Sequence, residues 1–258
     1  MSLTGKCIIV TGCSRGMGEA TLKVYVAAGA HVVGMDVMDD GGEKVVATAN
    51  AAGPGRATYT HVDISDRESV ESAFASAVET LGRLDVLAHP AAIQRASNAS
   101  EVSVDDWDLM FAVCVRGTML TNQVAHRYMK EAGGGSIINF GSISGLRAEV
   151  SAVAYSAAKG AVHSWTRTAA ATWGEDGVRV NAILPAMATP MFNEAVARLD
   201  DEGKKWMYWE NLHTIAMGKQ YGDPEKDLGP VMVFLASDGA GFITGQLLPV
   251  DGGQISVR

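Results

Sequence analysis

The sequence predicts a single α/β domain, in which a doubly wound parallel sheet of about seven strands has helices on both faces. Short apolar runs alternate with longer stretches of helical character along the whole chain, which is the pattern of parallel strands joined by helices. A length of 258 residues suits one such domain. No internal repeat, low-complexity tract or shift in composition marks a boundary, so we expect residues 1–258 to form one unit.

The predicted strands place several polar or distinctive residues at one edge of the sheet. The seven strands are expected at 7–10, 31–35, 57–62, 84–88, 136–140, 179–184 and 246–250. The clearest helices are expected at 19–28, 67–81, 105–131, 152–173 and 224–236. Right-handed crossovers bring the carboxyl ends of parallel strands to one edge, where ligands bind. The loop after Val10, together with Asp63, His89, Ser142 and Pro185, follows such ends, so we expect these positions to converge.

A glycine-rich segment follows the first predicted strand. It reads Thr11-Gly12-Cys13-Ser14-Arg15-Gly16-Met17-Gly18 and leads into the first predicted helix. Glycines let the backbone turn tightly and approach a pyrophosphate, and the helix N-terminus offers free N–H groups. The spacing Gly-x-x-x-Gly-x-Gly differs from the commonest dinucleotide fingerprint. Asp36 ends the second strand, 18 residues after Gly18, about where a carboxylate accepts from a ribose 2′-hydroxyl, so the unit predicts a nucleotide site.

Two residues with complementary chemistry lie one turn apart in the predicted helix 152–173. Tyr155 and Lys159 are spaced i, i+4, so they share one face of the helix. A nearby ammonium group favours the phenolate form of a tyrosine, and such a phenol can give or take a proton in carbonyl or alcohol chemistry. Ser142, 13 residues before the tyrosine, can hold the same substrate oxygen. The spacing alone is a weak signal, and the glycine-rich segment strengthens it.

These motifs resemble the short-chain dehydrogenase/reductase family. The resemblance rests on segment 11–18, Asp63, Ser142, Tyr155-x-x-x-Lys159, Arg179-Val180-Asn181-Ala182 and the closing Val250-Asp251-Gly252-Gly253. It runs from about Leu3 to the C-terminus and implies a Rossmann-type fold with direct hydride transfer between a nicotinamide and a carbinol carbon. The motifs are specific for the family and much less specific for the substrate.

The resemblance also implies roles for single residues. Tyr155 would be the general acid/base, Lys159 would bind the nicotinamide ribose, and Ser142 would hold the substrate oxygen, with Ser144 as its competitor. Thr189 would contact the nicotinamide carboxamide, and Asp63-Ile64 the adenine, although Asp63 can equally be a turn or helix-cap residue. The full set of expected cofactor contacts is Gly12, Ser14, Arg15, Gly16, Met17, Gly18, Asp36, Asp63, Ile64, His89, Ala91, Tyr155, Lys159, Pro185 and Thr189.

Charge around the ribose favours NAD over NADP. Asp36 would repel a 2′-phosphate, no Arg or Lys follows it directly, and Asp39 and Asp40 add negative charge. Arg15, just before the second glycine, leaves NADP open as the less favoured cofactor, because a basic residue there can pair with a 2′-phosphate.

The chain departs from the family pattern at three places. Cys114 stands where the family has an asparagine, in a helix that breaks there, and its role is in doubt. His89-Pro90-Ala91-Ala92 replaces Asn-Asn-Ala-Gly, so the adenosine-side wall should differ, since proline lacks an N–H and alanine disfavours positive φ. Ala186 replaces the usual glycine after Pro185, and one residue is missing before Thr189.

The segment 190–221 takes the place of the family's variable substrate lid. Its aromatic and methionine residues, with Met191, Trp206 and Trp209 foremost, can line an apolar pocket, and Gln94 and Ser144 can reach it. The same residues could instead pack on their own core or on another subunit. We expect a hydrophobic or cyclic secondary alcohol, or its ketone, as substrate.

Composition excludes several other classes of function. The net charge is −8 and no Lys/Arg cluster stands out, which argues against nucleic acid or an anionic membrane as partner. No apolar run approaches the ~20 residues of a membrane span, and the six histidines have no metal-ligand spacing, so we expect no metal. Three cysteines without a CxxC motif favour the reducing cytoplasm, and the family resemblance implies a homotetramer.

The sequence therefore predicts an NAD(H)-dependent oxidoreductase that interconverts a secondary alcohol and a ketone. Two alternatives remain open at this point. One is an NADPH-dependent carbonyl reductase that uses Arg15, and the other is a nucleotide-binding regulatory protein with impaired turnover. The intact set of Ser142, Tyr155 and Lys159 argues against the second.

Overall fold

Seven parallel strands form one sheet in the computed structural model, which describes residues 1–255 apart from the side chains of Met191 and Ala195. The strands are β1 (Cys7–Thr11), β2 (His31–Asp36), β3 (Arg56–His61), β4 (Val86–His89), β5 (Gly135–Phe140), β6 (Val178–Pro185) and β7 (Leu247–Val250). Their order is β3-β2-β1-β4-β5-β6-β7. The order reverses between β1 and β4, which is where open α/β sheets bind ligands. The predicted fold class is confirmed.

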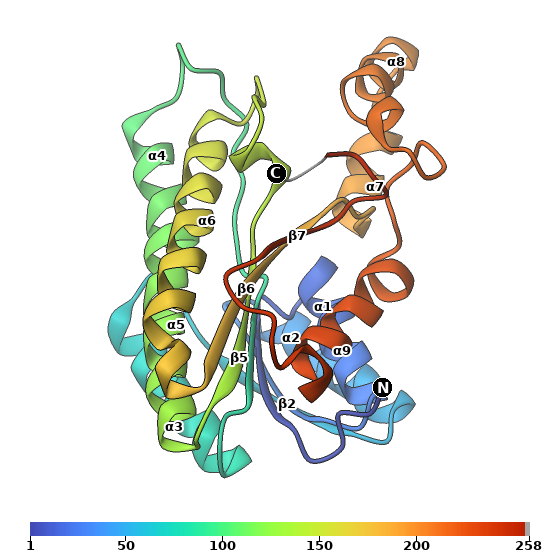
Figure 1. The fold of residues 1–258 in the computed structure, drawn as a ribbon. Coiled ribbons are helices and arrows are strands. Elements are labelled where there is room, and N and C mark those ends of the chain that lie inside the picture. Colours follow the sequence, from blue (N-terminus) through green and yellow to red (C-terminus); the bar gives the residue numbers. More distant parts are fainter. Residues whose placement is uncertain (256–258) are drawn as a thin grey trace.

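Helices cover both faces of the sheet because alternate residues of its strands point to opposite sides. Ile8 and Val10 of β1 pack with α1 (Gly16–Ala27), α2 (Asp39–Ala52) and α9 (Gly229–Ala236), whereas Ile9 packs with α3 (Arg67–Leu81), α5 (Gly117–Glu131) and α6 (Val153–Trp173). Figure 1 shows these two layers on either side of the sheet. The central strands β1, β2, β4, β5 and β6 are largely buried on both faces, which explains their mostly apolar sequences. The edge strands β3 and β7 are partly exposed.

The predicted helix 105–131 is not one regular α-helix. It consists of α4 (Val104–Met110), a π-helical turn η1 (Phe111–Arg116) and α5. A π turn holds an extra residue and shifts the following helix, and such turns occur often at functional sites. The predicted helix 224–236 is divided in the same way, since a π-helical turn, η5 (Pro224–Leu228), precedes α9.

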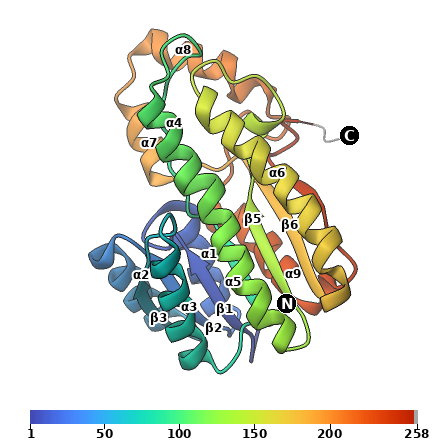
Figure 2. The same cartoon turned by 90° about the vertical axis from the view of Figure 1, so that its left-hand side faces the viewer.

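The segment expected to form a lid lies beyond the carboxyl edge of the sheet. It contains α7 (Pro190–Ala197), α8 (Asp201–Glu210) and a 3₁₀ turn, η4 (Leu212–Thr214). Figures 1 and 2 show α7 and α8 standing at the same end of the molecule as the N-terminal end of α6. The lid and the first turns of α6 therefore flank the edge where the predicted site residues converge.

Candidate active site

The positions expected to converge do lie at one edge of the sheet. His89 and Pro185 end β4 and β6, and Ser142 follows β5 by two residues. The glycine loop begins where β1 ends, beside β4. The carboxyl edge of the four central strands thus carries residues predicted for nucleotide binding and residues predicted for acid/base chemistry.

The glycine loop has the shape that a dinucleotide pyrophosphate needs. Gly12 has φ +63, and a side-chain carbon there would lie only 2.7 Å from Cα of Ala91. The glycine loop and the loop after β4 can therefore pack this closely only because residue 12 has no side chain. The residue before α1, Arg15, forms no side-chain cap, which leaves the first N–H groups of a 12-residue helix for a phosphate. Thr189 also lies next to the glycine loop. A Cβ added to Gly16 would be 3.6 Å from Cγ2 of Thr189. These residues fit a bound nicotinamide dinucleotide.

Asp36, the residue predicted to accept from the adenosine ribose, is fixed beside the glycine loop. Its carboxylate accepts from the backbone N–H groups of Ser14 at 3.0 Å and Met38 at 3.1 Å, so its position is fixed by the glycine loop itself. Asp39 lies close by in sequence and accepts from His61 and Tyr59, and these hydrogen bonds, that of His61 first, lower the pKa of the Asp39 carboxyl. Two carboxylates, those of Asp36 and Asp39, therefore lie at and just after the end of β2.

Asp63 and Ile64 differ in what they contact. The Asp63 carboxylate accepts from the N–H and hydroxyl of Ser65 at 2.8 and 2.7 Å. This is the local turn that the sequence analysis gave as the alternative to an adenine contact. Ile64 is buried. The Asp63 side chain thus has a structural role in the described residues, while a contact with adenine stays a prediction.

Tyr155 and Lys159 lie on the first two turns of α6 and face the same way. The Lys159 ammonium is 5.4 Å from the centre of the Tyr155 ring. Lys159 is buried and donates to the Phe140 carbonyl at the end of β5 at 2.6 Å. The lysine is thereby tied to the strand that carries the Ser142 loop, and the predicted pairing of phenol and ammonium is present.

Ser142 is held by a histidine that the sequence analysis did not single out. The Ser142 N–H donates to Nε2 of His163 at 3.3 Å, and His163 is 1% exposed. The Ser142 hydroxyl accepts from the N–H of Ser144 and donates to the Ser144 hydroxyl, both at 3.1 Å. Tyr155, Lys159 and His163 follow one another at four-residue spacing, and that spacing was the available signal for His163.

His89 faces the protein interior. Its Nδ1 lies 2.8 Å from the Thr11 hydroxyl and 3.3 Å from the Thr121 hydroxyl, and the residue is 2% exposed. Burial first, and the positive charge of Lys159 second, lower the pKa of His89 to about 3. His89 therefore links β1, β4 and α5 as a neutral side chain, and its neighbour Ala91 is the residue that abuts the glycine loop.

Cys114 lies inside the π-helical turn and is 1% exposed. Its thiol donates weakly to the Ile93 carbonyl at 3.4 Å, and its own carbonyl accepts from the Thr118 hydroxyl at 2.7 Å. The break in this helix, which the sequence left in doubt, is present without an asparagine side chain. A buried thiol with a carbonyl neighbour has the properties of a packing residue.

Two of the lid residues expected to line an apolar pocket are largely exposed. Trp206 and Trp209 are 57% and 64% exposed, and Trp209 packs on Tyr208 and His213 within the lid itself. Phe192 and Tyr221 pack edge to face at 4.7 Å. Gln94 is exposed, and the Met191 side chain lies outside the described residues. Arg147, which the sequence analysis did not single out, reaches the lid and donates to Asn211 at 3.3 Å.

Two further classes of site find no support in the part of the chain that the structure describes. Within residues 1–255 no group of three His, Cys, Asp or Glu side chains is placed to hold a metal ion. Over the same residues no helix is both long and apolar enough to cross a membrane.

Comparisons with known proteins agree with this geometry. Residues 12–254 match the family model described as enoyl-(acyl carrier protein) reductase. The meso-2,3-butanediol dehydrogenase of Serratia marcescens is 37% identical over 98% of this chain and 96% of its own length. The 2,5-dichloro-2,5-cyclohexadiene-1,4-diol dehydrogenase of Sphingobium indicum is also 37% identical, over 99% of both chains.

A solved structure gives the same result for the fold. A short-chain type dehydrogenase/reductase from Mycobacterium ulcerans superposes with a TM-score of 0.91 at 29% identity, covering 98% of this chain and 91% of the other. Similar proteins across the full length are thus dehydrogenases or reductases that act on hydroxyl groups, and this chain is an oxidoreductase of the same kind. It belongs to the short-chain dehydrogenase/reductase family.

Proposed function

We propose that the protein is an NAD(H)-dependent dehydrogenase that interconverts a secondary alcohol and a ketone. The observation that carries the proposal is the placement of Tyr155, Lys159 and Ser142 around the N-terminal half of α6, at the sheet edge that also holds the glycine loop. A nicotinamide, when bound, supplies the hydride acceptor or donor.

The chain's own residues supply the proton and hold the substrate oxygen. Tyr155 takes the hydroxyl proton during oxidation and returns it during reduction. The Ser142 hydroxyl binds the same oxygen, and its backbone is fixed by His163. Lys159 places a positive charge 5.4 Å from the centre of the Tyr155 ring. Orientation and electrostatics account for the protein's part in the reaction.

The choice of NAD follows from the charges after β2. Asp36 is held by two backbone N–H groups, so it cannot swing away from a 2′-phosphate without losing both. Asp39 adds a second carboxylate whose pKa is lowered. Arg15 is exposed, so its charge is well solvated and counts for less than the fixed carboxylate.

The proposed substrate is a small linear or cyclic secondary alcohol rather than a long-chain one, because the names of the Serratia and Sphingobium relatives specify diols of four and six carbons. Phe192 and Tyr221 offer aromatic surface near Thr189, which suits the apolar part of such a molecule.

We also propose that the chain acts as a homotetramer. Val104, Trp107 and Leu109 of α4 and Val150 before α6 are large apolar residues that are exposed in the single chain. The family resemblance implies assembly through the long helices predicted at 105–131 and 152–173. These exposed residues lie on or next to those helices, and burial against a second copy would remove them from water. Light scattering after size exclusion measures the state directly.

One experiment tests the proposed activity. The purified protein is mixed with NAD⁺ or NADP⁺ and a panel of secondary alcohols, or with the reduced cofactors and the ketones, and absorbance at 340 nm is followed. Turnover with NAD⁺ that exceeds turnover with NADP⁺ supports the proposal. The absence of any absorbance change with every alcohol and ketone, in a protein that binds NADH, would favour a nucleotide-binding protein without turnover.

A further inference from the structure

The Ser142 loop leaves the sheet with a backbone N–H that the strands do not pair. The ladder between β5 and β6 ends at Phe140 and Ile183, and the Gly141 N–H makes the last bond to β6, with the Ile183 carbonyl at 2.8 Å. Ser142 is the first residue beyond this ladder, and it is half-buried. A buried N–H without a partner costs free energy, so the loop needs an acceptor from another element.

His163 of α6 is that acceptor, and two glycines make room for its ring. The Ser142 N–H donates to Nε2 of His163 at 3.3 Å. A side-chain carbon on Gly141 would lie 2.5 Å from Nε2, and one on Gly145 would lie 2.7 Å from Cε1. The imidazole therefore packs against both ends of the loop segment 141–145, where the chain has no side chains.

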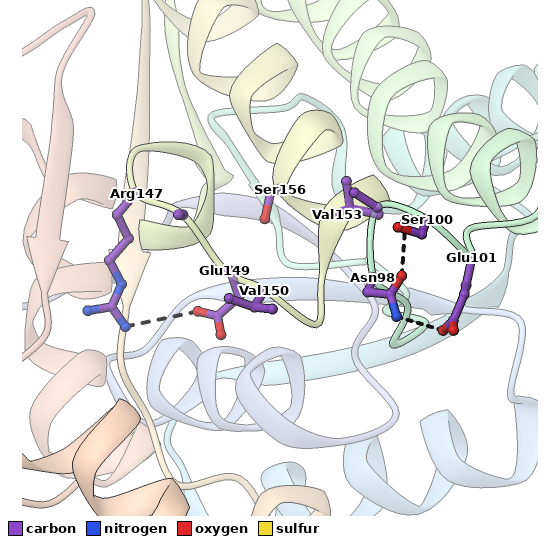
Figure 3. Close-up of a pocket in the computed structure, with 10 residues that line it drawn as sticks. Asn98, Ser100, Glu101, Arg147, Glu149, Val150, Val153 and Ser156 are labelled. Carbon is purple, nitrogen blue, oxygen red and sulfur yellow. Dashed lines mark hydrogen bonds and ion pairs between the residues drawn. The ribbon is translucent and has the colours of Figure 1, made fainter.

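The residues that follow this loop line a different space. Residues 147–150 line a pocket of about 520 Å³ together with residues 98–101 and the start of α6. Figure 3 shows the Arg147 and Glu149 side chains turned toward one another in this pocket, and Ser142 does not line it. The contact that fixes the Ser142 backbone therefore comes from α6 rather than from the residues around the pocket.

This contact requires one particular form of the histidine. Because Nε2 accepts from the Ser142 N–H, the ring proton of the neutral imidazole must be on Nδ1. His163 is buried, and its Nδ1 has no hydrogen-bond partner among the described residues. Burial first, and then the positive charges of Lys159 and Arg167, lower the pKa of His163 to about 4. Near neutral pH the ring therefore keeps the lone pair with which Nε2 accepts.

The contact also links Ser142 to Tyr155. Tyr155 and His163 are both on α6, two turns apart, so a loop bound to His163 has a fixed place relative to the phenol. The serine hydroxyl is one side-chain torsion away from its backbone, and a shift of the backbone therefore shifts the hydroxyl. A misplacement of about 1 Å in a site of this kind can lower a rate about 100-fold.

We propose that His163 is a positioning residue for the reaction, whose neutral Nε2 sets the place of the Ser142 hydroxyl relative to Tyr155. The inference rests on the proposed dehydrogenase function and deepens it, because it adds a residue that acts through Ser142. The imidazole of His163 takes no part in proton transfer.

The test compares three substitutions at one position. The side-chain oxygen of glutamine is as many bonds from Cβ as Nε2 of histidine is, whereas that of asparagine corresponds to Nδ1. His163→Gln can therefore keep an acceptor for the Ser142 N–H, while His163→Asn and His163→Leu cannot. Thr166→Val is the matched control. It removes another buried hydrogen bond between α6 and β5, in which the Asn139 side chain donates to the Thr166 hydroxyl at 3.1 Å.

The kcat and KM values are measured with NAD⁺ and a secondary alcohol that the wild type oxidises, and circular dichroism shows whether each variant is folded. His163→Asn and His163→Leu should lower kcat by about tenfold or more. Their NADH affinity in a fluorescence titration should change by less than about twofold, because the contact supports the serine and not the dinucleotide. His163→Gln should stay within about threefold of the wild-type kcat, and Thr166→Val within about twofold.

The same substitutions in a Ser142→Ala background show whether the effect passes through the serine. Without the hydroxyl there is no group left for His163 to position. His163→Asn and His163→Leu should then lower the residual kcat by no more than about twofold. A purely structural role of the ring predicts the same loss in both backgrounds.

Folded His163→Asn and His163→Leu variants that keep more than about a third of the wild-type kcat would overturn the proposal. So would equal losses in the two backgrounds, a His163→Gln variant as slow as His163→Leu, or the failure of all three variants to fold. Failure of the proposed function is a separate outcome, because a folded wild type that oxidises no alcohol and reduces no ketone removes the dehydrogenase activity itself.

Discussion

Two buried histidines beside Lys159 should make the fold sensitive to mild acid. Burial, with the charge of Lys159 as the second cause, lowers the pKa of His89 to about 3. Burial, Lys159 and Arg167 lower the pKa of His163 to about 4. In the unfolded chain a histidine takes up its proton near pH 6.5. Between these values the unfolded state binds protons that the folded state does not, so stability must fall as pH falls.

The magnitude follows from the difference in bound protons. From about pH 6.5 down to pH 5 each such histidine lowers the free energy of unfolding by about 1.4 kcal/mol per pH unit. Over this range one histidine therefore accounts for about 2 kcal/mol. Above about pH 6.5 neither state binds the proton, and the effect disappears. For a chain of this length, about 2 kcal/mol corresponds to a change of roughly 4–8 °C in Tm.

His89→Asn tests this in a single substitution. An asparagine side-chain oxygen can occupy the place of Nδ1 and keep the contact with Thr11, but it does not titrate. The variant should lose about 2 kcal/mol less stability than the wild type between pH 7 and pH 5, whatever its stability at pH 7. Urea unfolding at constant ionic strength and one protein concentration measures this difference.

A histidine beside a cation rather than a carboxylate provides the control. His31 is half-buried at the start of β2, where its ring contacts Arg56, and His31→Asn should follow the acid dependence of the wild type to within about 0.5 kcal/mol, as expected of substitutions away from the core. If the wild type and His89→Asn lose the same stability between pH 7 and pH 5, His89 is not held neutral in the folded protein, and the physical account of its surroundings is wrong.

The remaining predictions concern catalysis and the lid. Tyr155→Phe should lower kcat by about 100-fold or more with NAD affinity unchanged in a fluorescence titration; a variant that keeps a tenth of the rate contradicts the acid/base role. Asp36→Ala should raise kcat/KM with NADP relative to NAD, and a wild type already faster with NADPH would show that Arg15 prevails. Cys114→Ala should keep most of the activity, Cys114→Asn should equal or exceed the wild type, and complete loss in a folded alanine variant would reveal a chemical role of the thiol. Alanine at Trp206 or Trp209 should raise KM for apolar substrates with little change in Tm, whereas loss of the oligomer at unchanged KM would indicate subunit packing.

The central strands could be predicted because burial on both faces gives them short, mostly apolar sequences, whereas the edge strand β3 is partly exposed and carries several polar residues. Their ends were less certain, and the reason is visible at β4. Leu84 is completely buried, so it belongs to the apolar run that predicted the strand, but the ladder starts at Val86. Burial and ladder pairing are different properties, and the sequence pattern reports only the first.

The two π-helical turns could not be predicted from the residues themselves. The segment Phe111–Arg116 has the apolar and polar pattern of an ordinary helix, and one extra residue in a turn leaves no mark on composition. The turn is associated with a tertiary contact, because Cys114 contacts the Ile93 carbonyl on a loop 21 residues away. The family resemblance gave the only indication of a break at this position.

The roles of Arg147 and His163 depend on packing in the same way. Arg147 stands in a loop whose sequence does not show which way the side chain points, and only its contact with Asn211, 64 residues away, places it against the lid. His163 is buried, and its contact with the Ser142 backbone gives it a position beside the predicted site that burial alone does not imply.

The arrangement of His163 explains how one helix can set the geometry of the whole acid/base site. Tyr155, Lys159 and His163 lie on successive turns of α6, and each reaches a different partner: the substrate space, the Phe140 carbonyl and the Ser142 N–H. Phe140 and Ser142 flank Gly141, where a side chain would collide with the His163 ring. Lys159 and His163 of α6 therefore hold the Ser142 loop at Phe140 and at Ser142, the residues on either side of Gly141. A shift of α6 would move the phenol and the serine hydroxyl together, so that the two groups proposed to hold one substrate oxygen keep their spacing.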